Sequence, residues 1–330
     1  MHSSPWQATG HFAKLFVKMK DRVTFIVIGR NEGRNLARCF TSLKKISDNI
    51  IYVDSNSNDD SILIAKSFNI KRIIKIKSNY YSASLGRYVG AQEAKTEFIQ
   101  FIDGDMTLSK CWIPFAIKRL SSTDDVAVVL GYKKVYKKND RDYFILSDNK
   151  EWEPDYLGGG FLIKTNVYKK VNGFDVRMIG EEERDLYVRI RSLGFRVLYL
   201  QHLMISHYDF KNTSLKLRLF GERTASVWLP LISAFINRNF KSYIFVYRQM
   251  LPSLLLDIPT IIFICTFSLK YLFFGILLQI IELIYVLSIR RRGYFIVWKA
   301  GFINILKAIK LYRRKIDYSV EIINLSSLIS

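Results

Sequence analysis

Cysteine is scarce in this 330-residue sequence, and the few cysteines that occur are widely separated. They are Cys39, Cys111 and Cys265, and no two of them stand in a CxxC arrangement. This excludes a disulfide framework and a zinc knuckle, which both need closely or regularly spaced cysteines. A chain of this length can bury ordinary hydrophobic cores in about two domains, so it does not need such cross-links in order to fold.

The usual glycine-rich nucleotide motifs are also missing. Gly158-Gly159-Gly160 is not followed by the GK[ST] of a P-loop, and no GxGxxG follows a predicted strand. The main sequence evidence for a nucleotide triphosphatase or a dinucleotide dehydrogenase is therefore missing. Acidic residues number 29 against 50 lysines and arginines, and the net charge of +21 indicates an anionic partner. A nucleic acid is the least favoured partner, because the basic residues are not interleaved with an RNA-binding signature.

The first 210 residues predict a leader followed by an α/β domain. Residues 1–22 show no long apolar stretch and no small-residue cleavage site, so we expect a leader that is not a secretion signal, with an amphipathic helix as one option. Residues 23–210 alternate apolar runs with helical patterns, an order that favours a mostly parallel sheet flanked by helices. The apolar runs are 23–28, 50–53, 73–76 and 98–102, and the helical patterns are 35–45, 61–68 and 84–94.

Polar side chains follow three of these predicted strands. They are Asn31-Glu32, Asp54-Ser55 and Asp103-Gly104-Asp105. Ligands of parallel sheets bind beyond the carboxyl ends of the strands, so we expect a site there. Asp54 lies too early to cap the next helix, which leaves it free to accept hydrogen bonds from a base or a ribose. Arg87 could pair with a phosphate, although a solvated helix-face arginine is the ordinary alternative.

The region 211–330 has a different character. It holds 17 lysines and arginines but only five acidic residues, and two apolar runs of about transmembrane length, 251–269 and 271–289. Basic residues on both outer flanks fit a membrane hairpin with its two ends in the cytoplasm. Only Lys270 separates the runs, so a re-entrant or interfacial hairpin is a second option, and two buried core helices are a third.

A basic amphipathic pattern follows the hairpin. Phe302, Ile305, Leu306, Ile309 and Tyr312 fall on one helical face, and most of the nearby lysines and arginines fall on the other. This pattern is typical of a helix on an anionic membrane surface. A solvated helix packed on the domain is the alternative.

Two acidic clusters carry the predicted chemistry. Asp103 and Asp105 leave one buried strand around a glycine, and two such carboxylates can hold a hard divalent cation that bridges a diphosphate. Glu181, Glu182 and Glu183 open a predicted helix, where the helix dipole alone explains one or two acidic residues. Three together suggest an acidic pocket with a general base. His207 is either structural or adds one nitrogen ligand to the cation site.

Six segments in this order resemble the glycosyltransferase family 2 enzymes of the GT-A fold. The resemblance covers residues 23–210 and rests on VIGRNE, VDSNSNDDS, GRYVGAQEAKTEFIQFIDGD, GGGFLIKTNVYKKVNGFD, GEEERDLYVRIRSLGFRV and SHYDF. It implies the following contacts for residues of the first strands. Asn31, Glu32, Asp54 and Ser55 would surround the nucleotide, Arg87 would approach the diphosphate, and Asp103 would contact the ribose or the metal.

The resemblance also implies roles for the later motifs. Asp105 would bind Mg²⁺ or Mn²⁺ directly, His207 matches a downstream metal-binding histidine, and Gly159 and Gly160 would border the donor sugar and the acceptor. Glu182-Glu183 matches the family's Glu-Asp pair, with Glu183 in the position of the base. Because Glu183 replaces an aspartate and is one methylene longer, the role could pass to Glu182. Asn56 stands where glycine is common, and asparagine tolerates a left-handed turn.

The sequence therefore predicts a metal-dependent, inverting glycosyltransferase. Its expected donor is a nucleotide-diphosphate sugar, most simply UDP-linked, and its expected acceptor is a hydroxyl of a glycan or of a lipid-linked molecule in polysaccharide or glycolipid synthesis. We expect it at the cytoplasmic face of a membrane, held by the apolar hairpin and anionic lipid. The alternatives are a sugar-phosphate nucleotidyltransferase and a catalytically silent membrane protein that only binds a nucleotide sugar.

Overall fold

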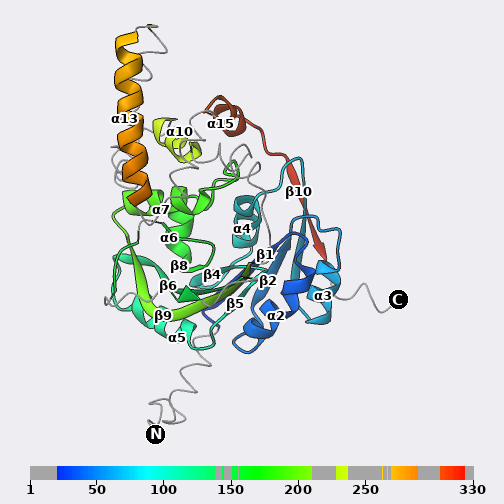
Figure 1. Ribbon diagram of the computed structural model, residues 1–330. Helices are drawn as coiled ribbons and strands as arrows, with labels where there is room; N and C mark the ends of the chain where they lie inside the picture. Colours follow the sequence, from blue (N-terminus) through cyan, green and yellow to red (C-terminus); the bar gives the residue numbers. More distant parts are fainter. Residues whose placement is uncertain are drawn as a thin grey trace. The chain divides into compact units, whose positions relative to one another are not determined.

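The computed structural model describes residues 21–137, 143–144, 151–154, 156–209, 228–236, 262, 266, 269–288 and 305–323. The chain divides into two compact units: residues 1–212 together with 314–330, and residues 213–313. The first unit contains one large sheet with helices on both faces (Figure 1). The predicted α/β architecture is therefore confirmed for this unit.

The elements of the first unit follow the expected alternation through the first four strands. In chain order they are β1 (Val23–Gly29), α2 (Gly33–Lys44), β2 (Ile50–Asp54), α3 (Ser61–Ser67), β3 (Arg72–Ser78), α4 (Ala83–Gln92), β4 (Phe98–Asp103), β5 (Met106–Leu108), α5 (Trp112–Ser121), β6 (Val126–Lys137), β7 (Tyr143–Phe144), β8 (Phe161–Lys164), α6 (Thr165–Lys170), α7 (Glu182–Ser192), β9 (Arg196–Asp209) and β10 (Tyr318–Ile323).

The sheet is mixed, which corrects the expectation of a mostly parallel one. Its strand order is β10-β3-β2-β1-β4-β8-β6-β9-β5, with β7 beside β6. Among the described strands, four pairings are parallel and five are antiparallel. The parallel part is the βαβ half, β1 to β4, where crossover helices return the chain in the same direction. The other half, and β10 at the far edge, join the sheet mostly through antiparallel pairs.

Helices cover the two faces of this sheet, with α4, α6 and α7 on one side and α2, α3 and α5 on the other (Figure 1). Strands β1, β2 and β4 are buried along almost their whole length, as expected for strands packed on both faces. Gly90 lets α4 lie directly on the sheet, because a Cβ there would come within 2.5 Å of Cγ2 of Ile26. This close packing brings the rest of α4, including Arg87, toward the strand ends.

The strand register gathers the predicted polar residues at one edge. Gly29 of β1 lies opposite Asp54 of β2, and Ile28 lies opposite Asp103 of β4. The carboxyl ends of β1, β2 and β4 therefore meet, and the segments that follow them start from the same edge. Asn56 has φ of 57°, which confirms the expected left-handed turn after β2.

The second unit contains helices only, among the residues that are described: α10 (Leu229–Ile236), α13 (Leu269–Ser288) and α15 (Ile305–Tyr312). The second predicted apolar run coincides with α13, whereas most of the first run, 251–269, falls outside the described residues. No helix in the described part of the chain meets the length and hydropathy required to cross a membrane. In α15, Leu311 and Tyr312 are buried while Leu306 is largely exposed.

Candidate functional site

The turns after β1 and β2 form one hydrogen-bonded unit. The backbone N–H of Asn31 donates to Oγ of Ser57 at 2.9 Å, and the N–H of Asn58 donates to Oδ1 of Asn31 at 2.8 Å. Asn31 has φ of 56°, so this asparagine also adopts the left-handed conformation. Glu32, next in the chain, is buried, and its Oε2 accepts a hydrogen bond from the side chain of Asn35 at 2.9 Å. The two loops are thereby held at a constant separation at the strand ends.

Asp54 is the centre of the second turn and is completely buried. Its carboxylate accepts hydrogen bonds from the hydroxyl of Tyr52 at 2.9 Å, from Oγ of Ser57 at 2.6 Å and from the N–H of Ser57 at 2.8 Å. Burial, with the carboxylate next to it, also raises the pKa of Tyr52 above its ordinary value. The sequence predicts an Asp54 that is free to accept hydrogen bonds from a base or a ribose. In the structure this carboxylate instead holds its own turn, which also contains the buried Ser55.

Arg87 links the strand edge to α7. It extends from α4 with only 2% of its side chain exposed, and its guanidinium contacts three carboxylates. Nη2 lies 2.9 Å from Oδ1 of Asp103, while Nη1 lies 3.0 Å from Oε1 of Glu182 and 3.0 Å from Oε1 of Glu183. One buried arginine thus joins the acid predicted to contact the ribose or the metal to the two glutamates predicted as candidate bases. We call Arg87, Asp103, Glu182 and Glu183 the arginine cluster.

The two glutamates of the arginine cluster differ in environment. Glu182 has an 8% exposed side chain, against 19% for Glu183. Burial, and then the charge of Glu183, raise the pKa of Glu182 to about 8 despite the opposing effect of Arg87. Two adjacent carboxylates in one buried site resist double ionisation, so near neutral pH the proton resides on Glu182. Glu183 is the more accessible member of the pair.

Asp105, two positions after Asp103, forms a second pair with the distant His207. Strand β5 pairs with β9 so that Met106 faces His207, and the carboxylate Oδ2 of Asp105 lies 3.1 Å from Nε2 of His207. Both side chains are partly exposed. Within the described residues, no three or more acidic, histidine or cysteine side chains are arranged as a complete metal site. The pair is therefore a two-donor arrangement of one oxygen and one nitrogen.

The glycine-rich segment passes directly over the arginine cluster. A Cβ on Gly159 would lie 2.6 Å from Oδ2 of Asp103, and one on Gly160 would lie 3.2 Å from Cδ1 of Ile205. A side chain at Gly159 would collide with a carboxylate that already binds Arg87. The structure thus brings Gly159 together with Asp103.

Sequence reasoning missed several residues that shape this edge. Tyr52 and Ser57 hold Asp54, and Arg38 places its guanidinium 3.9 Å from the ring centre of Tyr208. The repeated serines and asparagines after Asp54 were a usable signal, because such residues hydrogen-bond their own turns. Nothing in the sequence pairs Arg38 with Tyr208, which are 170 positions apart in the printed numbering.

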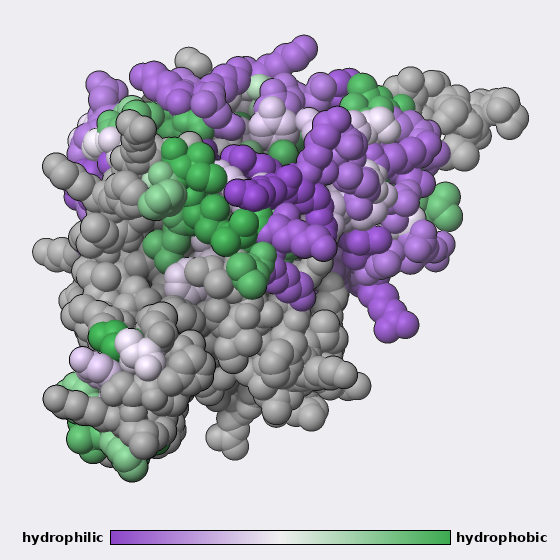
Figure 2. All heavy atoms as spheres, turned by 90° about the horizontal axis from the view of Figure 1, so that it is seen from above, coloured by the Kyte–Doolittle hydropathy of each residue, from purple (hydrophilic) through white to green (hydrophobic). Residues whose placement is uncertain are grey.

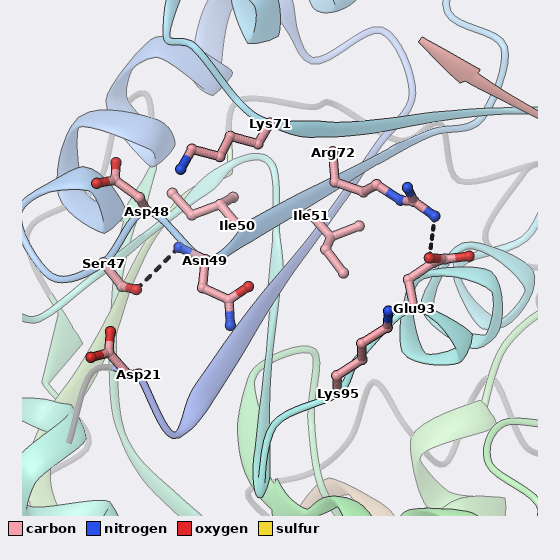
Figure 3. Close-up of a pocket in the computed structure, with 10 residues that line it drawn as sticks. All are labelled: Asp21, Ser47, Asp48, Asn49, Ile50, Ile51, Lys71, Arg72, Glu93 and Lys95. Atoms are coloured by element: carbon pink, nitrogen blue, oxygen red, sulfur yellow. Dashed lines mark hydrogen bonds and ion pairs between the residues drawn. The ribbon is translucent and has the colours of Figure 1, made fainter. Parts of the chain in front are cut away.

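A separate pocket of about 470 Å³ lies at the opposite, amino edge of the parallel strands. It is lined by residues at the starts of β2 and β3, in the segments that follow α2, α3 and α4, and just before β1 (Figure 3). Its charges are mixed, and Arg72 and Glu93 are paired with each other across it (Figure 3). This pocket contains none of the predicted site residues. The candidate site is therefore the carboxyl edge, where the acidic residues, Arg87 and His207 lie.

The family comparison matches the segment that builds this edge. Residues 24–176 match the family model described as glycosyl transferase family 2. Two curated relatives are named uncharacterized glycosyltransferases: one from Rickettsia conorii, 32% identical over 28% of this chain and 32% of its own length, and one from Rickettsia bellii, 33% identical over 27% and 29%. The match thus spans about a third of these relatives.

Solved structures show the same fold at low sequence identity. The chain is similar to a crystal structure of GalNAc-T7 with UDP, GalNAc and Mn²⁺, with a TM-score of 0.51 and 12% identity over 64% of this chain and 48% of that one. It is also similar to Staphylococcus aureus TarS residues 1–349, with a TM-score of 0.50 and 16% identity over 64% and 65%.

Proposed function

We propose that this chain, whose residues 24–176 form a glycosyltransferase family 2 domain, transfers a sugar from a nucleoside-diphosphate donor to an acceptor hydroxyl with inversion at the anomeric carbon. The donor is a UDP-sugar and the acceptor a glycan or a lipid-linked molecule. The observation that carries this proposal is the arginine cluster, which joins an acid at the end of β4 to two acids at the start of α7.

The proposed division of labour follows from where the side chains lie. Asn31, Glu32 and Ser55, on the linked turns after β1 and β2, border the nucleotide, and Asp54 keeps those turns in shape. Glu183 accepts the proton of the acceptor hydroxyl, because it is the more accessible member of its pair. The oxygen of that hydroxyl then attacks the anomeric carbon from the face opposite the departing diphosphate, with the reactants held in position by the enzyme.

Asp105 and His207 are the residues that would hold a divalent cation. The carboxylate oxygen fits Mn²⁺ or Mg²⁺, and the imidazole nitrogen favours Mn²⁺, because Mg²⁺ prefers oxygen ligands; Mg²⁺ sites commonly use only one or two protein carboxylates and complete their shell with substrate phosphates and water. A two-donor arrangement is therefore compatible with a substrate-completed site. When bound, such a cation supplies positive charge that stabilises the leaving diphosphate. The solved neighbour GalNAc-T7, which contains Mn²⁺ and UDP, supports this choice.

A nucleotide-sugar panel tests the proposed activity. With Mn²⁺ and a broad set of acceptors, we expect release of UDP from a UDP-sugar and loss of that release with a chelator. Asp105→Asn and His207→Ala should each lower the rate by about tenfold or more, because each removes a ligand from a charge-stabilising site. His202→Ala is the matched control, since this histidine lies on the same strand but stacks on Phe115 instead.

Three outcomes of the panel would contradict the proposal. Pyrophosphate release from a sugar phosphate and a nucleoside triphosphate would identify a nucleotidyltransferase. Tight UDP binding without turnover for any donor and acceptor would identify a silent binding protein. Equal losses in His202→Ala and His207→Ala would show that the histidine effect is structural, which would remove the proposed role of His207.

We also propose that the second unit attaches the enzyme to the cytoplasmic face of an anionic membrane. Large apolar side chains are exposed on its helices, including Phe235 of α10 and Leu306 of α15, which are 72% and 78% exposed. Lys310 and Arg313 lie exposed on and just after α15. Figure 2 shows hydrophobic residues gathered at the surface. Apolar side chains beside cations favour an anionic lipid surface.

Vesicle flotation tests the membrane attachment. We expect the full chain to float with vesicles that contain phosphatidylglycerol more than with phosphatidylcholine alone, and to float less at high salt, because the charge contribution is screened. Leu306→Glu should reduce flotation severalfold. Leu193→Glu, at an exposed leucine of the first unit, is the matched control and should float like the unchanged protein. Equal flotation of both variants would contradict the assignment of this surface.

A further inference from the structure

Strand β10 is the last strand at one edge of the large sheet in the part of the chain that the structure describes. It pairs antiparallel with β3 from Tyr318 to Ile323, and Figure 1 shows it as the red arrow at that end of the sheet. Among the described strands, none pairs with the outer side of β10. Every other backbone N–H and C=O of such a strand points outward, so an open edge offers a template for one more strand.

The outer strand also carries an apolar stripe. Tyr318, Val320 and Ile322 alternate along it and are 42%, 50% and 44% exposed. In the antiparallel register Val320 faces Ile76 and Ile322 faces Ile74, and both of these isoleucines are buried. Opposed residues share one face of a sheet, so the stripe continues the apolar layer of β3 outward. It is a layer that the described helices leave partly uncovered.

The strand is held firmly enough to act as a template. The N–H of Asn79 donates to the carbonyl of Asp317 at 3.2 Å, and the N–H of Asp317 donates to Oδ1 of Asn79 at 3.2 Å, which fixes the point where β10 begins. Lys77 and Glu321 form an ion pair at 3.2 Å across the two strands. The edge is therefore already extended and in register, so a partner strand meets it without first ordering it.

We propose that β10 pairs antiparallel with β10 of a second copy of this chain, with Val320 on the two-fold axis. The sequence of the strand favours this register. It sets Tyr318 opposite Ile322, which pairs two apolar side chains, and Ser319 opposite Glu321, which pairs a hydroxyl with a carboxylate. Such self-complementarity is what a two-fold interface requires.

Both neighbouring registers place like charges together. With Glu321 on the axis, the two copies of this glutamate face each other directly. With Ser319 on the axis, Asp317 of each copy faces Glu321 of the other. Like charges directly opposite destabilise a strand pair. A single strand pair is smaller than the roughly 1,200–2,000 Å² of a typical stable interface, so the dimer should depend on concentration.

Cysteine cross-linking tests the register. In a Cys111→Ser, Cys265→Ser background, which removes the thiol exposed among the described residues and the cysteine outside them, Val320→Cys should form a disulfide-linked dimer under mild oxidation. Opposed Cβ atoms lie about 4.5–5.5 Å apart, close to disulfide range. Ile322→Cys is the matched control, because its two copies would lie about 13 Å apart along the strands. An equal mixture of Tyr318→Cys and Ile322→Cys should cross-link, and neither should do so alone.

Molar mass measurement provides the second readout. The unchanged chain should shift from monomer toward dimer as its concentration rises, and Val320→Lys, which sets two cations face to face, should stay monomeric with its transferase rate unchanged. The proposal is overturned if the unchanged chain stays monomeric throughout, or if Val320→Lys dimerises equally well. It is also overturned if Val320→Cys cross-links no faster than Ile322→Cys.

Discussion

Replacing Glu183 by glutamine should lower sugar transfer by about 10²–10⁴-fold, the range that a positioned general base contributes. The amide keeps the size of the side chain but has no basic oxygen for the proton of the acceptor hydroxyl. The binding of UDP should change little, because Glu183 lies at the start of α7 and not in the turns after β1 and β2. Single-turnover transfer and calorimetric UDP titration together separate the two effects.

Glu182→Gln is the matched control for this experiment. Burial and the neighbouring carboxylate raise the pKa of Glu182 to about 8, so at neutral pH it already carries a proton and resembles the amide. We therefore expect Glu182→Gln to retain most of its activity. If Glu182→Gln loses transfer while Glu183→Gln keeps it, the base is Glu182, the alternative that the longer side chain at position 183 left open.

The parallel half of the fold could be predicted because its signals are local. The strands β1, β2 and β4 are apolar runs that stay buried on both faces, and the helical patterns between the strands require crossover connections. The antiparallel half depends on distant pairings, such as Met106 with His207, that no periodicity reveals. Strand β10 shows this most clearly, since its first residue, Tyr318, pairs with Ser78, 240 positions earlier in the sequence, and the strand exposes nearly all of its side chains.

The candidate site was predictable as a set of residues but not as a set of contacts. A carboxylate that follows a buried parallel strand is expected at the carboxyl edge of the sheet, where ligands bind. This rule predicts Asp54, Asp103 and Asp105 as site residues. Their partners depend on packing: Arg87 meets Glu182 only because α4 lies close on the sheet and α7 begins beside it. The implied contact of Arg87 with a diphosphate therefore competes with three carboxylates that the arginine already binds.

Arg87→Met should cost about 3–5 kcal/mol of unfolding free energy, as removal of one partner from a buried ion pair typically does. Methionine fills a similar volume but leaves Asp103, Glu182 and Glu183 without their shared cation. Arg87→Lys should recover only part of the loss, because one ammonium group lacks the planar fork that reaches three carboxylates. Denaturant unfolding of the purified proteins measures both variants, and a midpoint for Arg87→Met equal to that of the unchanged chain would contradict a charge-balancing role.

A double variant separates charge balance from substrate contact. Adding Glu183→Gln to Arg87→Met removes one of the uncompensated acids, so the double variant should be more stable than Arg87→Met alone, with a coupling energy in the range of about 0.5–3 kcal/mol expected for residues in contact. In that folded background, UDP affinity decides the remaining role of the arginine. Unchanged affinity means that Arg87 serves to position Asp103 and Glu183, whereas a large loss means that the guanidinium leaves the carboxylates to bind the diphosphate.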